Sequence, residues 1–220
     1  PARDEGAAEF AARIAAFAAD PTSIQLELLG ENRVSLTVSS EYLDYAAENE
    51  LETLVDFGIL RSAFLCDAAA DALAERGYCR GVVSSLDGYA RNLSGEKFGV
   101  NLFDRVDGTV TALGSVTYTA PAALVICRAF PASAQEKTRF YTYADGTVIP
   151  PYLNASGLPS AAAPNLVTLS REDSVAALAL RTVAAFAEVD AEFPTLTAFS
   201  WASVRDGAIV THGSDFQLGQ

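Results

Sequence analysis

Short stretches in which apolar and polar residues alternate occupy most of the chain after residue 79, and Asp-Gly pairs follow several of them. Six such stretches stand out: CRGVVSSL (79–86), KFGVNLF (97–103), TVTALGSVTYT (109–119), AALVICRAF (122–130), TRFYTYA (138–144) and NLVTLS (165–170). Alternation with period two is typical of strands, and an Asp-Gly pair is typical of a turn between neighbouring strands. The pattern therefore predicts a meandering, largely antiparallel sheet.

Helices interrupt these strands only a few times. Apolar residues recur at helical spacing in three segments, residues 5–20, 62–78 and about 173–188. Two further hairpins are expected, one on either side of Gly30-Glu31-Asn32 and one around Asp206-Gly207. Together the elements predict an α+β fold, formed as a single compact domain over residues 1–220, with residues 1–22 as an N-terminal helix.

Composition narrows the class of partner. Half of the 220 residues are hydrophobic and a fifth are charged, as in ordinary globular proteins. The formal net charge of −13 repels phosphate backbones, so nucleic acid is not an expected partner. The longest apolar run, residues 122–130, is too short to cross a bilayer, which predicts no transmembrane segment in this chain. The acidic stretch 41–56 is interpreted as a solvated helix or loop.

Neither the cysteines nor the histidine predicts a reactive site. Cys66, Cys79 and Cys127 lie beside apolar residues, and their number and spacing fit neither a disulfide framework nor a zinc site, so we expect three buried thiols. The single histidine, His212, stands in THGSDF next to Ser214 and Asp215. Catalytic triads are assembled from separated segments, so we expect His212 to be an exposed turn residue.

One turn-rich stretch has two interpretations. GVVSSLDGYARNLSGEKFG (81–99) places small and polar residues directly after a predicted strand, where backbone amides could hold a phosphate or a carbonyl group. The alternative is structural, a loop in which Gly88 and Gly95 adopt positive φ angles.

Several motifs resemble one known family in their order. DFGILRSAFLCDAAADALAERGYCRGVVSSLDG (56–88) is similar to the stretch of the FAD:protein FMN transferases, the ApbE family, that runs D-L-G-G-I-A-K-G-Y-A-V-D, then a helix, then a strand ending N-L-G-G. Asp56, Gly58, Asp67 and Gly88 match that pattern.

The resemblance continues over most of residues 50–220. YADGTVIPPYLNASGLP is similar to d-G-k-r-y-H-H-I-I-D-P-x-T-G-y-P, with Gly146, Ser156, Gly157 and Pro159 in register. VTLSREDSVAALALRT (167–182) falls without a gap on V-T-V-I-A-x-S-A-x-x-A-D-A-L-S-T, and Thr182 is among its matches. The family likeness implies a T-fold-type, largely antiparallel sheet with packed helices, and a location in the bacterial cell envelope.

In that family, Mg²⁺ on the FAD pyrophosphate helps a threonine of a partner protein to take FMN and release AMP. This chemistry requires an acidic metal ligand. Here the metal-binding Asp of D-A-L-S-T falls on Leu178, and the His and Asp of H-I-I-D-P fall on Pro150 and Leu153. The metal set is therefore expected to be lost, and Leu178 marks the position of the missing ligand.

Other polar positions of the family also differ. Its Lys in A-K-G-Y falls on Ser62 and the next Gly on Ala63, its T-S-G falls on residues 133–135, and the first Gly of N-L-G-G becomes Asp87. Asp87 is an acid in the turn that faces the flavin in the family, so a compensating metal site there is one alternative.

Three functions stay open on this resemblance. The preferred one is a domain that has lost or weakened FMN transfer and still binds FAD, FMN or another flat ligand. The others are a non-enzymatic domain that binds a protein partner, and an active but divergent Mg²⁺-dependent transferase. The resemblance places the cofactor-binding candidates at six residues: Asp87, Gly88, Ser133, Ser156, Gly157 and Thr182.

Overall fold

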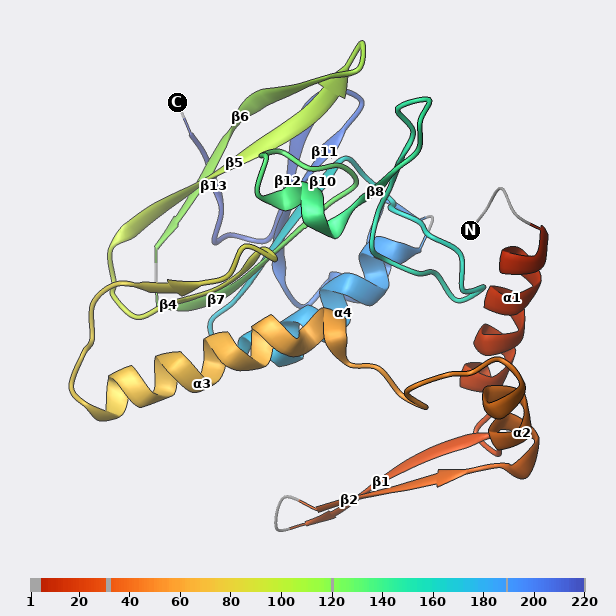
Figure 1. Ribbon diagram of the computed structural model, residues 1–220. Coiled ribbons are helices and arrows are strands. Elements are labelled where there is room, and N and C mark those ends of the chain that lie inside the picture. The colour runs from red at the N-terminus through yellow and green to blue at the C-terminus, as the bar shows by residue number, and fades with distance from the viewer. Residues whose placement is uncertain (1–4, 31–32, 120, 189, 220) are drawn as a thin grey trace. The chain divides into compact units, whose positions relative to one another are not determined.

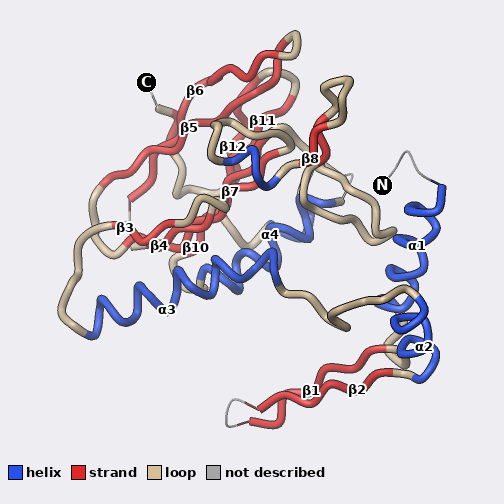
Figure 2. The backbone as a smooth tube through the Cα atoms, viewed as in Figure 1, coloured by secondary structure: helices blue, strands red, loops and turns tan. Residues whose placement is uncertain are grey.

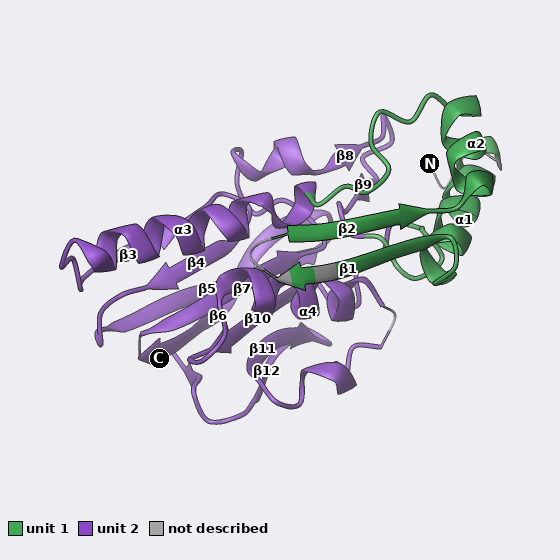
Figure 3. Ribbon diagram, turned by 90° about the horizontal axis from the view of Figure 1, so that it is seen from below, with its two compact units in different colours: residues 1–57, 153–158 green, residues 58–152, 159–220 purple. Residues whose placement is uncertain are grey.

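The computed structural model describes residues 5–30, 33–119, 121–188 and 190–219 (Figure 1). The chain forms two compact units, which Figure 3 distinguishes by colour. The smaller unit comprises residues 1–57 and 153–158, and the larger comprises residues 58–152 and 159–220. The α+β class with largely antiparallel sheets is confirmed. That the whole chain folds as one domain stays a prediction.

The smaller unit contains two helices and one hairpin. Helix α1 (Glu5–Ala19) is followed by β1 (Ile24–Gly30), β2 (Arg33–Val38) and α2 (Ser40–Glu48). Phe17 of α1 and Tyr42 of α2 are buried against each other, with ring centroids 5.0 Å apart. The acidic stretch 41–56 thus begins as a helix, with Ser39 as its N-cap. Residues 31–32 of the predicted first turn lie outside the described residues.

Strands dominate the larger unit (Figure 2). Its main sheet has the order β12-β11-β10-β7-β4-β3, and every neighbouring pair is antiparallel. These six strands are β3 (Val82–Ser84), β4 (Tyr89–Asn92), β7 (Ala122–Arg128), β10 (Asn165–Ser170), β11 (Ser200–Arg205) and β12 (Ala208–His212).

A second sheet of three strands has the order β13-β6-β5. It contains β5 (Lys97–Val106), β6 (Thr109–Thr119) and β13 (Gln217–Leu218). A short hairpin of β8 (Tyr141–Thr142) and β9 (Val148–Ile149) stands apart from both sheets in its pairing. Helices α3 (Arg61–Glu75) and α4 (Val175–Ala187) and three short 3-10 segments, Gly58–Leu60, Glu136–Arg139 and Pro194–Leu196, complete the unit.

The central strands of the main sheet are buried on both faces, because the two helices cover one face and the second sheet covers the other. Alternation along β7 illustrates this: Val125 and Cys127 belong to the helix-side core, whereas Leu124 belongs to the core shared with β5 and β6. In β10, all six residues are buried for the same reason. The alternation of side chains between the two faces of each strand therefore determines which of them contact α4.

Two side chains accept hydrogen bonds from the first backbone amides of helix α4. Ser174 is its N-cap and accepts a hydrogen bond from the amide of Ala177. Asp67 of α3 accepts hydrogen bonds from the amides of Val175 and Ala176 at 2.8 and 2.9 Å. These are amides that have no partner within the helix, and a carboxylate is also favoured at this end of a helix. Asp67 therefore joins the two helices.

Two strand predictions need correction. In the stretch 138–144, residues up to Arg139 form a 3-10 segment instead, because Glu136 accepts hydrogen bonds from the Arg128 side chain and the Ala132 amide and so closes a turn. The strand predicted over 79–86 is only three residues long, because Ser85–Gly88 form a turn. The turn leads into β4, which lies in the stretch 81–99 that was predicted to be a loop.

Three residue-level predictions are also wrong. Gly88 has a positive φ angle as expected, but Gly95 does not. Cys66 and Cys127 are buried, whereas Cys79 is exposed in the loop between α3 and β3. His212 is not an exposed turn residue: it ends β12, is partly buried, and stacks on Trp201 with 5.3 Å between ring centroids. None of the described helices is long and apolar enough to cross a membrane.

Candidate functional site

The turn from Ser85 to Gly88 joins β3 to β4 and has a fixed backbone. Gly88 has a φ angle of +88°, which favours glycine, and a Cβ atom at this position would lie 2.3 Å from the carbonyl oxygen of Ile126. The Ile126 amide donates a hydrogen bond of 2.7 Å to the Gly88 carbonyl. Only glycine therefore fits where this turn crosses β7.

Asp87 lies on this turn and is held by two side chains. Its carboxylate accepts a short hydrogen bond from the Ser62 hydroxyl at the start of α3, and an ion pair joins it to Arg139 with 3.3 Å between Nε and Oδ1. The side chain of Asp87 remains 38% exposed, whereas that of Arg139 is 17% exposed. The carboxylate is thus anchored on one side and open to solvent on the other.

Uncharged groups lie in the core next to this cluster. Burial raises the pKa of the Cys127 thiol to about 12, and burial also raises the pKa values of Tyr89 and Tyr152 well above the ordinary range. The Tyr89 hydroxyl donates a 2.6 Å hydrogen bond to the carbonyl of Ile59. These three groups stay protonated at neutral pH, so Asp87 and Arg139 carry the charges of the cluster.

Ser133 is exposed at the start of the 3-10 segment Glu136–Arg139. Its hydroxyl accepts a hydrogen bond from the Glu136 amide at 3.4 Å. Because Arg139 ends the same segment, the geometry that orders Glu136 also positions the guanidinium that meets Asp87. The structure thereby connects Ser133 to the Asp87 turn through a single short element.

Thr182 and Leu178 have a different environment, because both are fully buried on the inner face of α4. The Thr182 hydroxyl donates to the carbonyl of Leu178 at 2.8 Å and shares a 2.7 Å hydrogen bond with the hydroxyl of Thr168 on β10. Leu178 has no exposed surface and belongs to the helix-side core. As described, Thr182 offers no surface to a ligand.

Ser156 and Gly157 belong to the smaller unit. They form a tight turn in which the Asn154 side chain accepts a hydrogen bond from the Ser156 amide at 3.0 Å. Gly157 has a φ angle of +73°, and a Cβ there would lie 2.5 Å from the carbonyl oxygen of Ala11. Their local geometry is therefore accounted for by packing on α1.

The cluster of Ser62, Asp87 and Arg139 was not predicted as a unit. Ser62 and Asp87 differ from the family pattern separately in the sequence, and Arg139 stood in a predicted strand. In the structure, a hydroxyl donor at one of these positions faces a carboxylate at the other. The two departures from the pattern that the chain resembles, Ser62 and Asp87, were the one signal that could have indicated this contact.

A second polar group surrounds a hollow of about 460 Å³ at the ends of β11 and β12. Asp215 accepts hydrogen bonds from Ser200 at 2.7 Å and from Arg171 at 2.8 Å. His212, which also lines the hollow, has its Nε2 3.3 Å from the Thr197 carbonyl oxygen. Asp215 is thus engaged by a serine and an arginine rather than by the histidine, and the arrangement is not that of a hydrolytic triad.

Comparison with known proteins adds no identity to this geometry. No protein-family model matches the chain, and no curated protein matches it. Among the described residues, no three His, Cys, Asp or Glu side chains converge in a way that could hold a metal ion.

Proposed function

We propose that the larger unit is a domain of the FMN-transferase type in which metal-dependent transfer has been lost, and that it binds a flavin or another flat ligand at the Asp87 turn. The observation that carries the proposal is the environment of Thr182. It is the one retained polar residue of the D-A-L-S-T motif. Its hydroxyl is buried and is hydrogen-bonded to the Leu178 carbonyl and the Thr168 hydroxyl.

The residues at the expected metal position do not fit Mg²⁺. This cation takes oxygen ligands, and a leucine side chain has none to offer. Leu178 is also enclosed by core residues, so neither water nor phosphate reaches it in the described structure.

The ligand-binding part of the proposal rests on the anchored carboxylate. Asp87 is held by Ser62 and Arg139 while more than a third of its side chain stays exposed, so it can accept hydrogen bonds without first being ordered. A carboxylate attracts N–H and O–H donors and repels phosphate. The ligand is thus expected to present a ring N–H or hydroxyl groups to Asp87 rather than a phosphate.

Flavin binding tests this proposal directly. Riboflavin, FMN and FAD are titrated with the whole chain, and flavin fluorescence and visible absorbance are followed. The proposal predicts saturable binding that Asp87→Asn weakens, by about 10-fold if a charge-assisted hydrogen bond of about 1.5 kcal/mol is lost. Asp71→Asn, the same change at an exposed position of α3, is the matched control and is expected to leave binding unchanged.

A second function is favoured by one observation, the exposure of two large apolar side chains on α3. Phe64 and Leu65 are 55% and 59% exposed. Exposed apolar side chains can form part of a protein-binding surface when they belong to one contiguous patch. If none of the three flavins binds, the interaction function takes precedence, and replacing both residues by serine is the first change to test against a partner.

A further inference from the structure

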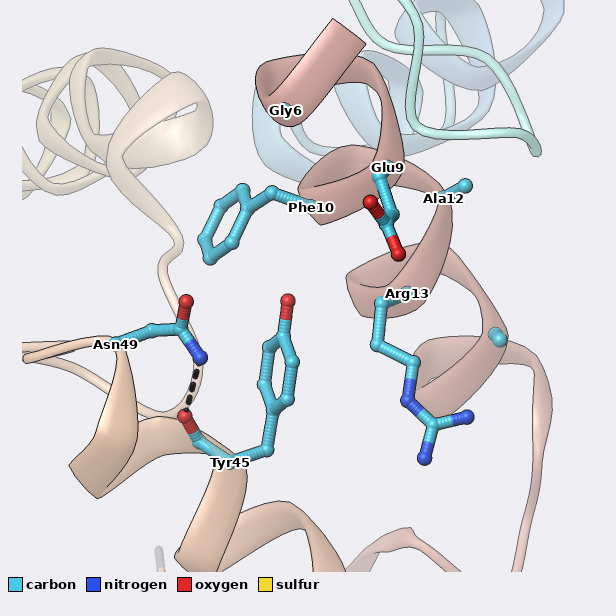
Figure 4. A pocket seen from close by; sticks show the side chains of 8 residues that line it. Gly6, Glu9, Phe10, Ala12, Arg13, Tyr45 and Asn49 are labelled. Atoms are coloured by element: carbon cyan, nitrogen blue, oxygen red, sulfur yellow. Dashed lines mark hydrogen bonds between the residues drawn. The ribbon is translucent and has the colours of Figure 1, made fainter.

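A hollow between the two helices of the smaller unit is lined by residues that take no part in the proposed flavin site. It measures about 560 Å³, within the range of about 300–1,000 Å³ that is usual for small-ligand sites. Its lining comes from α1, α2 and the C-cap residue of α2, Asn49, as Figure 4 shows. Helical spacing explains most of the lining, because Glu9 and Phe10 are four and three residues before Arg13 on α1.

Aromatic rings form one wall of this hollow. Phe10 and Tyr45 are stacked, with ring centroids 6.1 Å apart and an interplanar angle of 24°. Their faces carry negative charge density, which attracts a cation placed within about 6 Å of a ring. In Figure 4 the Tyr45 hydroxyl points into the space between the two helices.

The polar groups of the hollow have unused bonding capacity. Among the described residues, no cation pairs with the Glu9 carboxylate and no hydrogen bond engages the Tyr45 hydroxyl. Arg13, by contrast, is occupied: its guanidinium pairs with Glu41 and lies 4.6 Å from the Phe17 ring centroid. The available charge in the hollow is therefore negative.

The smaller unit as a whole favours the same ligand. Residues 1–57 hold twelve acids and only three bases, and residues 153–158 hold no charged residue. A field of this sign concentrates cations near the surface and raises their rate of association. Long-range charge and local ring geometry thus point to one ligand class.

We propose that the hollow between α1 and α2 binds an organic cation, an alkylammonium or guanidinium group, between the Phe10–Tyr45 rings and the Glu9 carboxylate. The group can come from a free amine or from a lysine or arginine side chain of a protein. This site is separate from the Asp87 turn and does not depend on flavin binding.

The test follows amide and ring NMR signals of α1 and α2 in the whole chain. The probes are n-butylammonium and n-butylguanidinium, with uncharged n-pentanol as the control. A capped Gly-Leu-Arg-Leu-Gly peptide is compared with the same peptide carrying citrulline, which has the shape of arginine without its charge. Saturable shifts with the charged probes and none with the uncharged ones are expected.

Two variants localise the binding. Glu9→Gln is expected to weaken it about 2- to 5-fold, the range for an exposed ion pair. Tyr45→Leu is expected to weaken it by a similar factor through loss of the ring face, whereas Tyr45→Phe retains binding. Glu52→Gln changes the net charge equally at an exposed residue outside the lining, and is expected to have no such effect.

The outcomes separate cleanly. A peptide that binds at least about ten times more tightly than the free cations identifies a protein side chain as the source, and equal binding identifies a free amine. The proposal is overturned if the unsubstituted chain gives no shifts, if pentanol or the citrulline peptide gives the same shifts, or if Glu52→Gln weakens binding as much as Glu9→Gln.

Discussion

Leu178 is the position at which substitution distinguishes a closed core from a metal site most sharply. The side chain is fully buried in the same core as Trp201, the single tryptophan. Replacing a buried leucine by alanine costs about 2–5 kcal/mol. For a chain of this size the melting temperature then falls by about 4–20 °C, at about 2–4 °C per kcal/mol. Leu178→Ala supplies the baseline.

Leu178→Asp adds a titratable group to that cavity. Burial raises the pKa of an enclosed carboxyl in the folded state above its unfolded value of about 3.9. Because the folded state then binds more protons than the unfolded state above that pH, the free energy of unfolding falls as pH rises, by about 1.4 kcal/mol for each unit of the pKa difference. Leu178→Asn, which is polar and does not titrate, should lack this dependence.

The assay is urea unfolding followed by Trp201 fluorescence between pH 4 and pH 8, with and without millimolar Mg²⁺. We expect the stability of Leu178→Asp to decline across this range relative to Leu178→Asn, and Mg²⁺ to restore none of it. A chelator-sensitive gain in stability with Mg²⁺ contradicts the reasoning, because it requires that position 178 face a site a cation can enter. A loss below about 1 kcal/mol for Leu178→Ala contradicts the burial.

Three further predictions follow from local geometry. Gly88→Ala should destabilise the larger unit by more than Gly146→Ala does in urea unfolding. Both residues have positive φ angles, but only at Gly88 would a Cβ atom clash with the backbone, so equal losses of stability contradict the close approach. Ellman's reagent should titrate one thiol in the folded chain and three in urea, and Cys79→Ser should abolish the fast reaction; two fast thiols contradict the burial of the others. Partial burial would raise the pKa of Asp215, but hydrogen bonds from Ser200 and Arg171 outweigh this effect and lower the pKa. The stability that this carboxylate adds is therefore present above its pKa in the unfolded state, and it is lost as the pH falls through its pKa in the folded state. Asp215→Asn should flatten the acid limb of unfolding free energy against pH, and an unchanged limb contradicts the assignment.

Elements whose patterning is local were predictable from the sequence. Strand β10 has the predicted bounds 165–170, and the hairpin around Asp206-Gly207 forms as expected. Helices α1, α3 and α4 differ from their predicted bounds by a few residues at most. In each case the apolar spacing and a nearby cap or turn residue give the same answer.

The predictions that failed depended on side-chain contacts and loop geometry that apolar periodicity does not record. Glu136 closes a 3-10 segment because the Arg128 side chain on β7 lies within reach, and no periodicity in residues 138–144 records that contact. Cys79 is exposed because it lies in the loop between α3 and β3, whatever the polarity of its neighbours in the sequence. Predictions from local sequence patterns do not include side-chain contacts of this kind, which can override local propensity.

The site shows the same division. The positive φ angle of Gly88 agrees with the structural interpretation of the stretch 81–99, whereas that interpretation was wrong for Gly95. The triplet of Ser62, Asp87 and Arg139 brings together residues from α3, a turn and a 3-10 segment, and only the fold reveals it. Burial of Thr182 is likewise a tertiary fact, since it requires Thr168 to face α4 from β10.

The release of AMP from FAD is the measurement that tests the central claim most directly. The whole chain is incubated with FAD and millimolar Mg²⁺ in the presence of a threonine-containing acceptor peptide, and AMP is quantified by chromatography with and without a chelator. Because the proposal assigns Leu178 to the position of the metal ligand, and because Leu178 and Thr182 are both fully buried, we expect no AMP above the level without protein. AMP release that the chelator abolishes would contradict the loss of transfer.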